Sequence, residues 1–319
     1  MRFSVIIPLY NKAPYVSKAI NSVLSQSFGD YELIVMDDGS SDDSFDVASK
    51  AIEGHRNCHI HRQQNAGVSM ARNNAVALSE GEYLCFLDAD DWWSPAFLEE
   101  MDKLIDEYPE AGILGTNYII VNEAKHKTRI ASVAVEPGFE KGYINYCRVY
   151  AASMYMPLWT GAVCIPRKVF VEMDGFNPLL RLGEDFDLWI RIALKYKVAF
   201  LNEPLSYYNQ DSAAQWRAVS HLQEPRSHVL WNLGYLEEKE KTDSDYKQLV
   251  DNLRTMGLLS YYLSREYHKD AKKELDKVDW AKQPRKTRNQ YNMPIFALQC
   301  QKALQRAGSV IKQWLFKYI

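Results

Sequence analysis

The chain has 319 residues and a formal net charge of −3, and 47% of its residues are hydrophobic and 13% aromatic. This length and hydrophobic content suffice for a substantial core in one large or two ordinary domains. No segment approaches the roughly 20 apolar residues of a membrane-spanning helix, and the start lacks the apolar stretch and cleavage site of a secretory signal. Five scattered cysteines form no CxxC pair and no metal-ligand spacing, so we expect a cytoplasmic protein with buried free thiols.

The first hundred residues alternate between strand-like and helix-like segments. The patterns predict strands at 3–8, 31–38, 58–62 and 82–88, and helices at 14–27, 41–54 and 67–81. Ser94 and Pro95 are typical of the N-cap and first position of the next helix. Strict alternation of this kind predicts a mostly parallel sheet with helices on both faces, an α/β fold.

The remainder of the chain is less regular. Strands are expected at 113–121 and 159–166, a helix at 183–196 and a strand pair at 198–208. From Glu224 onward the pattern is mostly charged and helical. We therefore expect three regions, at residues 1–110, 111–223 and 224–319.

Acidic residues follow two of the predicted strands, where ligands bind in parallel α/β sheets. Asp88-x-Asp90 ends one strand, and carboxylates at this spacing suit a hard divalent cation such as Mg²⁺ or Mn²⁺. The alternative is that these acids only solvate the turn and favour the start of the next helix. Asp37 and Asp38 end another strand, where Asp-Gly-Ser is also ordinary turn chemistry. The glycine-rich phosphate fingerprints are missing, which disfavours dinucleotide oxidoreductases and P-loop proteins.

Three ordered segments carry a resemblance to a known family. SVIIPLYNKAPYVSKAINSVLSQSF, YELIVMDDGSSDDS and NAGVSMARNNAVALSEGEYLCFLDADD together resemble the nucleotide-sugar-binding half of family 2 inverting glycosyltransferases with the GT-A fold. The similarity is dense over residues 3–100 and continues more thinly to about 210. It implies a nucleotide-sugar-binding half at 1–110, an acceptor-binding and catalytic half at 111–223 and a helical extension at 224–319.

The resemblance also implies roles for individual donor-side residues. Pro8 and Tyr10 would flank the nucleobase, and Asp38 would accept from the uracil ring. Arg72 would lie near the phosphates, and Asp88 would approach the ribose. Asp90 of the DxD motif would bind the Mn²⁺ or Mg²⁺ that bridges the diphosphate. Two alternatives stay open: Tyr10 as a packing residue, and Arg72 as the partner of a helix neighbour.

The acceptor side is expected near residue 184. Gly183-Glu184-Asp185 is similar to the family's ED element, which implies that Asp185 is the general base and that Glu184 lies on the acceptor side. These acids could instead only complement the start of a helix. Trp159 matches the family's acceptor-side loop, where its ring would stack on a sugar or belong to the core.

Two departures from the family pattern matter. Gln215-Trp216-Arg217 has the wrong spacing for the QxxRW element of processive members, which disfavours processive synthesis and a translocation pore. Tyr208-Asn209-Gln210-Asp211 replaces a Tyr-Arg-x-His stretch, which leaves Asp211 or His221 as candidates for a third metal contact.

The carboxyl end is strongly basic. Residues 281–319 contain eight Lys or Arg and no Asp or Glu, whereas the first 280 residues hold 30 basic and 41 acidic ones. An amphipathic stripe at 303–319 predicts a helix in an anionic membrane interface, with contact through 295–319. The alternatives are a helix that covers the catalytic domain and a homodimer seam.

The resemblance, taken with these patterns, implies a peripheral or soluble glycosyltransferase. It would use a UDP-sugar and a saccharide or lipid-linked acceptor in bacterial surface polysaccharide assembly, with no nucleic-acid partner. The alternatives are a nucleotidyltransferase, disfavoured by the absence of a glycine-rich basic loop, and a catalytically silent nucleotide- or glycan-binding protein.

Overall fold

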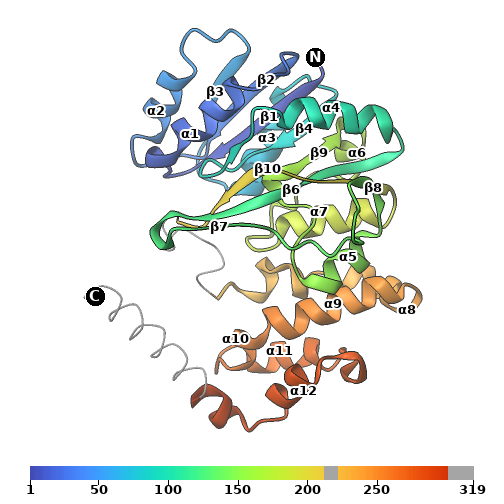
Figure 1. The fold of residues 1–319 in the computed structure, drawn as a ribbon. Coiled ribbons are helices and arrows are strands. Elements are labelled where there is room, and N and C mark those ends of the chain that lie inside the picture. The colour runs from blue at the N-terminus through green and yellow to red at the C-terminus, as the bar shows by residue number, and fades with distance from the viewer. Residues whose placement is uncertain (212–221, 301–319) are drawn as a thin grey trace. The chain divides into compact units, whose positions relative to one another are not determined.

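The computed structural model describes residues 1–211 and 222–300, and the chain divides into two compact units, Met1–Leu233 and Gly234–Ile319 (Figure 1). The first unit is built on a single ten-stranded sheet, and the second is helical.

The strands of the first unit hydrogen-bond in the order β3-β2-β1-β4-β9-β6-β10-β5, with β7 beside β6 and β8 beside β10. Their bounds are β1 Phe3–Leu9, β2 Tyr31–Asp37, β3 Cys58–Arg62, β4 Tyr83–Phe86, β5 Trp92–Trp93, β6 Ala111–Asn122, β7 Lys127–Ile130, β8 Lys141–Ile144, β9 Val163–Pro166 and β10 Lys197–Asn209.

Helices cover both faces of this sheet. Their bounds are α1 Ala13–Leu24, α2 Ser44–Ala51, α3 Val68–Leu78, α4 Phe97–Glu107, α5 Tyr146–Ser153, α6 Arg167–Glu172 and α7 Glu184–Ala193. The strand β1 is buried along its whole length. Its Val5 and Ile7 belong to the core that α1, α2 and α4 complete. Alternate residues of a strand point to opposite faces, so Ile6 is buried on the other side of the sheet.

The parallel part of the sheet aligns the ends that carry the acidic residues. Strands β3, β2, β1 and β4 are parallel neighbours, as the sequence predicts. Leu9 of β1 pairs with Asp37 of β2, and Ile6 pairs with Phe86 of β4. The segments that follow β1, β2 and β4 therefore leave the same edge of the sheet side by side. Beyond β4 the sheet is mixed, because β9 runs antiparallel to both β4 and β6.

Two local expectations are wrong. The helix expected to begin at Ser94 and Pro95 begins at Phe97, and no side chain caps it. Trp92 and Trp93 pair with β10 instead, and the backbone N–H of Ser94 donates to the carbonyl of Leu205 at 2.8 Å. The expected strand pair at 198–208 is one strand, β10, whose register against β6 shifts around Pro204, a residue without an N–H to donate.

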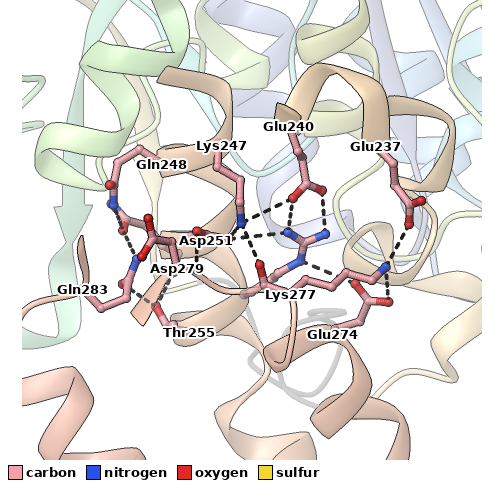
Figure 2. A network of polar contacts seen from close by, with 12 residues as sticks. Glu237, Glu240, Lys247, Gln248, Asp251, Thr255, Glu274, Lys277, Asp279 and Gln283 are labelled. Carbon is pink, nitrogen blue, oxygen red and sulfur yellow. Dashed lines mark hydrogen bonds and ion pairs between the residues drawn. The ribbon is translucent and has the colours of Figure 1, made fainter. Parts of the chain in front are cut away.

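The second unit contains α8 Glu237–Thr242, α9 Ser244–Gly257, α10 Leu259–Tyr262, α11 His268–Leu275 and α12 Arg285–Tyr291. Asp243 caps α9 by accepting from the N–H groups of Asp245 and Tyr246, both at 3.0 Å. Figure 2 shows the polar network within this unit, which includes Glu240, Asp251 and Glu274. The guanidinium of Arg254, 1% exposed, pairs with all three of these acids and donates to both carboxylate oxygens of Glu240 at 2.7 Å.

Four of the five cysteines are buried as expected, but Cys300 is exposed, and all five are free thiols. In the parts of the chain that the structure describes, no helix has the length and apolarity needed to span a membrane.

Candidate active site

The ends of β1 and β2 bring three predicted donor-side residues together. Pro8 is buried near the end of β1, and Tyr10 follows the strand with 40% of its surface exposed. Asp38 follows β2, and its backbone N–H donates to the carbonyl of Leu9 at 2.8 Å. The exposed ring of Tyr10 argues against the packing alternative for this side chain.

The buried carboxylate of Asp38 organises the loop before α3. It accepts from the backbone N–H groups of Ala66 and Gly67 and from the side-chain amide of Gln63, each at 2.8 Å. A carboxylate has about four acceptor positions, and these donors occupy three of them in Asp38, which is 3% exposed. Gly39 makes room for this loop: its φ is +74°, and a Cβ there would lie 3.0 Å from the backbone nitrogen of Asn65.

The turn after β4 carries three carboxylates that each have a different partner. The backbone N–H of Asp91 donates to the carbonyl of Asp88 at 3.0 Å and so closes the turn. Asp88 pairs with the guanidinium of Arg72 at 2.7 Å, and Asp90 pairs with the ammonium of Lys12 at 2.6 Å. The two cationic side chains thus offset the electrostatic repulsion among the three carboxylates.

Asp91 is the buried member of the three, at 2% exposure. Its carboxylate accepts from the backbone N–H of Asn209 at 2.8 Å and from the indole N–H of Trp159 at 3.2 Å. Burial, followed by the charges of Asp90 and Asp88, raises the pKa of Asp91 well above its ordinary value. The structure thus connects Asp91 to the end of β10 and to the loop that holds Trp159.

Arg72 joins two parts of the site that are distant in sequence. Its buried guanidinium, 3% exposed, pairs with Asp88 and also with Glu184, at 3.1 Å, although Glu184 is 112 positions away. The same group lies 5.0 Å from the ring centre of Phe176. The alternative of a partner within its own helix is therefore wrong for Arg72.

The predicted base, Asp185, lies in the first turn of α7. Its carboxylate accepts from the hydroxyl of Thr160 at 3.1 Å and from the N–H of Phe186 at 2.7 Å. Burial raises the pKa of Asp185, while Arg72 and these hydrogen bonds oppose the rise. Gly183, just before it, has a φ of +82°, and a Cβ there would lie 2.3 Å from Val229. Glycine therefore sets how α7 begins.

Trp159 belongs to an aromatic group. Its ring lies 5.7 Å from that of Tyr118 and 4.0 Å from that of Tyr208. This favours the packing alternative, although the side chain is only partly buried. The backbone N–H of Asp211 donates to the side chain of Asn209 at 2.9 Å, and its role as a metal contact stays a prediction. His221, the segment 215–217 and the helix predicted at 303–319 lie outside the described residues.

Sequence reasoning missed Lys12, and it placed Thr160 in the loop that resembles the family's acceptor-side loop without foreseeing its contact with Asp185. Lys12 stands in the PLYNKAPY segment, and Thr160 stands next to the Trp159 already singled out. A hydroxyl or an ammonium has no sequence pattern that marks its partner. Both contacts become apparent only when the strand ends are assembled.

Comparison with solved structures defines the class of fold. Residues 1–349 of Staphylococcus aureus TarS, in complex with UDP-GlcNAc, superimpose with a TM-score of 0.70 at 20% identity, covering 87% of this chain and 80% of that one. A mannosyltransferase from Pyrobaculum calidifontis, in complex with GDP-Man and Mn²⁺, gives a TM-score of 0.51 at 15% identity, with 88% of each chain covered. The first unit therefore has the GT-A glycosyltransferase fold.

Sequence comparisons identify the family. The model described as glycosyl transferase family 2 matches residues 4–155, and that of glycosyl transferase family group 2 matches residues 83–232. The chain belongs to family 2 of the glycosyltransferases. Glycosyltransferase GlyA of Streptococcus pneumoniae serotype 4 is 37% identical over 273 residues, which are 78% of this chain but 37% of that protein. An uncharacterized glycosyltransferase of Nostoc sp. is 29% identical over 211 residues, 65% of this chain and 64% of the relative. The chain thus spans little more than a third of the pneumococcal protein.

Proposed function

We propose that this chain transfers a sugar from a UDP-sugar, with inversion at the anomeric carbon, to a saccharide or lipid-linked saccharide acceptor. The setting we propose is the assembly of a bacterial surface polysaccharide, in a non-processive step. The observation that carries the proposal is the double ion pair of Arg72, which holds the strand-end acid Asp88 next to Glu184, the neighbour of the base Asp185. The S. aureus neighbour in complex with UDP-GlcNAc supports the choice of donor class.

On the donor side, the proposal assigns the base, ribose and diphosphate to consecutive strand ends. Asp38 would accept from the uracil with its remaining acceptor position, beside Pro8 and Tyr10. Asp88, with 29% of its side chain exposed, would reach the ribose. Arg72 already pairs with one oxygen of Asp88. It would therefore hold that carboxylate in position to contact the ribose, and it would itself lie near the phosphates.

The residues at the β4 turn fit a divalent cation, Mn²⁺ or Mg²⁺. Among residues 1–211 and 222–300, no group of three His, Cys, Asp or Glu side chains could hold a metal ion alone. Mg²⁺ commonly uses only one or two carboxylates together with substrate phosphates. The Oδ2 atom of Asp90 already accepts a cation, the ammonium of Lys12. Asp90 would hold the ion, Asp211 is the candidate for a further contact, and the bound ion would offset charge on the leaving diphosphate.

On the acceptor side, Asp185 would remove the proton from the attacking hydroxyl. The hydrogen bond from Thr160 and the backbone N–H of Phe186 fix the orientation of its carboxylate. Burial raises the pKa of Asp185, which strengthens it as a base, while the charge of Arg72 limits the rise. A single displacement then requires the hydroxyl to attack from the face opposite the diphosphate.

The test is Asp185→Asn. This variant should bind UDP in the presence of MnCl₂ as the native protein does, and should lose transfer by about 10²–10⁴-fold, the usual contribution of a general base. Asp276→Asn, the same substitution at an exposed position just after α11, is the matched control. Binding is followed by thermal shift, in which stabilisation follows RT ln(1 + [L]/Kd), and transfer by UDP release.

The donor base is tested separately by screening UDP-, GDP- and dTDP-sugars by thermal shift with and without MnCl₂. Undiminished transfer by Asp185→Asn would reject the assignment of Asp185 as the general base. Release of pyrophosphate would favour a nucleotidyltransferase. Metal-dependent UDP binding with no turnover of any donor–acceptor pair would favour a silent binding protein.

We also propose that the chain works at the cytoplasmic face of the inner membrane. The support is compositional: residues 295–319 carry Lys302, Arg306, Lys312 and Lys317 and no acid. Basic residues near an anionic surface contribute about 1 kcal/mol each. Co-sedimentation with anionic but not with zwitterionic vesicles is the expected result. A homodimer through the same segment would instead give concentration-dependent mass in sedimentation.

A further inference from the structure

The ion pair between Lys12 and Asp90 lies at the centre of the proposed donor site. The ammonium of Lys12 is 2.6 Å from Oδ2 of Asp90, and the two side chains are only 17% and 14% exposed. Lys12 comes from the segment between β1 and α1, and Asp90 from the turn after β4. Because β1 and β4 are neighbouring parallel strands, this contact bridges the edge of the sheet from which the donor-side residues project.

The backbone around Lys12 is held firmly. Its N–H donates to the hydroxyl of Ser44 at 2.7 Å, and the N–H of Asn11 donates to the hydroxyl of Ser40 at 3.0 Å. Asn11 has a φ of +51°, a left-handed conformation that turns the chain sharply after β1. The fixed part of Lys12 is therefore its backbone, and the movable part is the flexible four-carbon stem that ends in the ammonium.

We propose that Lys12 is a built-in counter-ion that holds Asp90 before the donor binds, and that its ammonium passes to the donor diphosphate when a divalent cation takes Asp90. This inference rests on the proposed function. A divalent ion and the ammonium compete for the same carboxylate oxygen. A lysine ammonium also binds phosphate oxygens well, as a compact point charge with three donors.

The exchange has a directional consequence. Before the donor arrives, a metal ion at Asp90 must either displace the ammonium from Oδ2 or bind beside its positive charge, and both are unfavourable. When the diphosphate arrives with the metal, the ammonium gains phosphate oxygens in return for the carboxylate. Lys12 therefore makes metal binding depend on the nucleotide, which reserves the ion for the donor complex.

The experiment compares the native protein with Lys12→Met, which removes the charge and keeps most of the stem. Lys50→Met is the matched control: Lys50 is exposed in the last turn of α2, which leads away from the carboxyl ends of the strands. MnCl₂ is titrated calorimetrically into each protein, first alone and then with saturating UDP. Circular dichroism and thermal melting confirm that each variant folds.

The native protein and Lys50→Met should bind Mn²⁺ weakly alone and much more tightly with UDP. Lys12→Met should bind Mn²⁺ alone about tenfold more tightly, because no charge-assisted hydrogen bond has to be broken first. The additional gain from UDP should shrink by a similar factor. If Lys12→Met binds Mn²⁺ alone no more tightly than the native protein, or not at all, the inference is overturned. Failure of the proposed function differs: then UDP with Mn²⁺ would bind to none of the three proteins.

Discussion

Arg72 offers the sharpest test of how the two halves of the site are joined. In Arg72→Met the buried guanidinium disappears, while Asp88 and Glu184 remain, with 29% and 15% of their side chains exposed. Removing one partner of a fully buried pair costs about 3–5 kcal/mol, and partial exposure of both acids reduces this to about 2–4 kcal/mol. For a unit of this size, such a loss lowers Tm by about 5–15 °C.

The pH dependence of that loss separates lost charge from lost packing. Burial first, then Asp185, raise the pKa of Glu184, whereas Arg72 lowers it. Without Arg72 the folded-state pKa of Glu184 lies further above its unfolded value. The variant therefore loses stability as pH rises from the ordinary pKa of the carboxyl through its raised folded pKa. The Tm deficit should accordingly be larger at pH 8 than at pH 5.

Thermal melts of Arg72→Met, of Arg72→Lys and of the native protein at both pH values measure this effect. Arg72→Lys should recover part of the Tm because it restores one charge but cannot fork between two carboxylates. Arg56→Met, a change at an exposed arginine, should shift stability by no more than about 0.5 kcal/mol. An equal deficit at pH 5 and pH 8 would refute the electrostatic explanation.

In transfer assays, the rise of activity with pH should move to higher pH in Arg72→Met, because Arg72 also lowers the pKa of Asp185.

Two further predictions concern stability. Burial lowers the pKa of His228 from 6.5 to about 4. As the pH falls, the unfolded chain therefore binds a proton at this histidine before the folded chain does. The free energy of unfolding should accordingly fall by about 3 kcal/mol between pH 6.5 and pH 4. His228→Asn keeps an acceptor for the N–H of Leu230 and should flatten Tm over this range; an unchanged slope would reject the assignment. In the second unit, Arg254→Met leaves Glu240 without its buried partner and should cost about 3–5 kcal/mol, seen as rapid proteolysis within 234–300. Lys272→Met, at an exposed ion pair, is the control that should resist proteolysis as the native chain does.

The fold and the positions of the acids could be predicted from the sequence because both follow from local patterns. Alternating strand and helix signals imply parallel strands, and parallel strands place their carboxyl ends at one edge. The sequence therefore predicts that Asp38, Asp88 and Asp90 lie at the same edge. It does not predict the start of α4, because the pairing of Trp92 and Trp93 with β10 prevails over the local capping signal of Ser94.

The partners of those acids could not be predicted, because they come from distant parts of the chain and from residue types without a distinctive pattern. The Arg72–Glu184 pair spans 112 positions, and the Lys12–Asp90 pair spans 78. Each depends on which strands become neighbours in the sheet, and on how α3 and α7 are placed over it. The sequence marks the charges, whereas the tertiary fold decides which charges meet.

Asp91 indicates why the DxD turn carries a third acid at all. A buried carboxylate that only shaped a turn would be costly, since burial and two neighbouring acids disfavour its charge. Its two oxygens accept instead from Asn209, at the end of β10, and from Trp159, in the loop before β9. The indole of Trp93 adds a second link to that loop through the carbonyl of Gly161 at 2.6 Å. The turn that holds Asp88 and Asp90 is thus tied to the loop whose Thr160 donates to Asp185, so a shift of this turn would also move the proposed base.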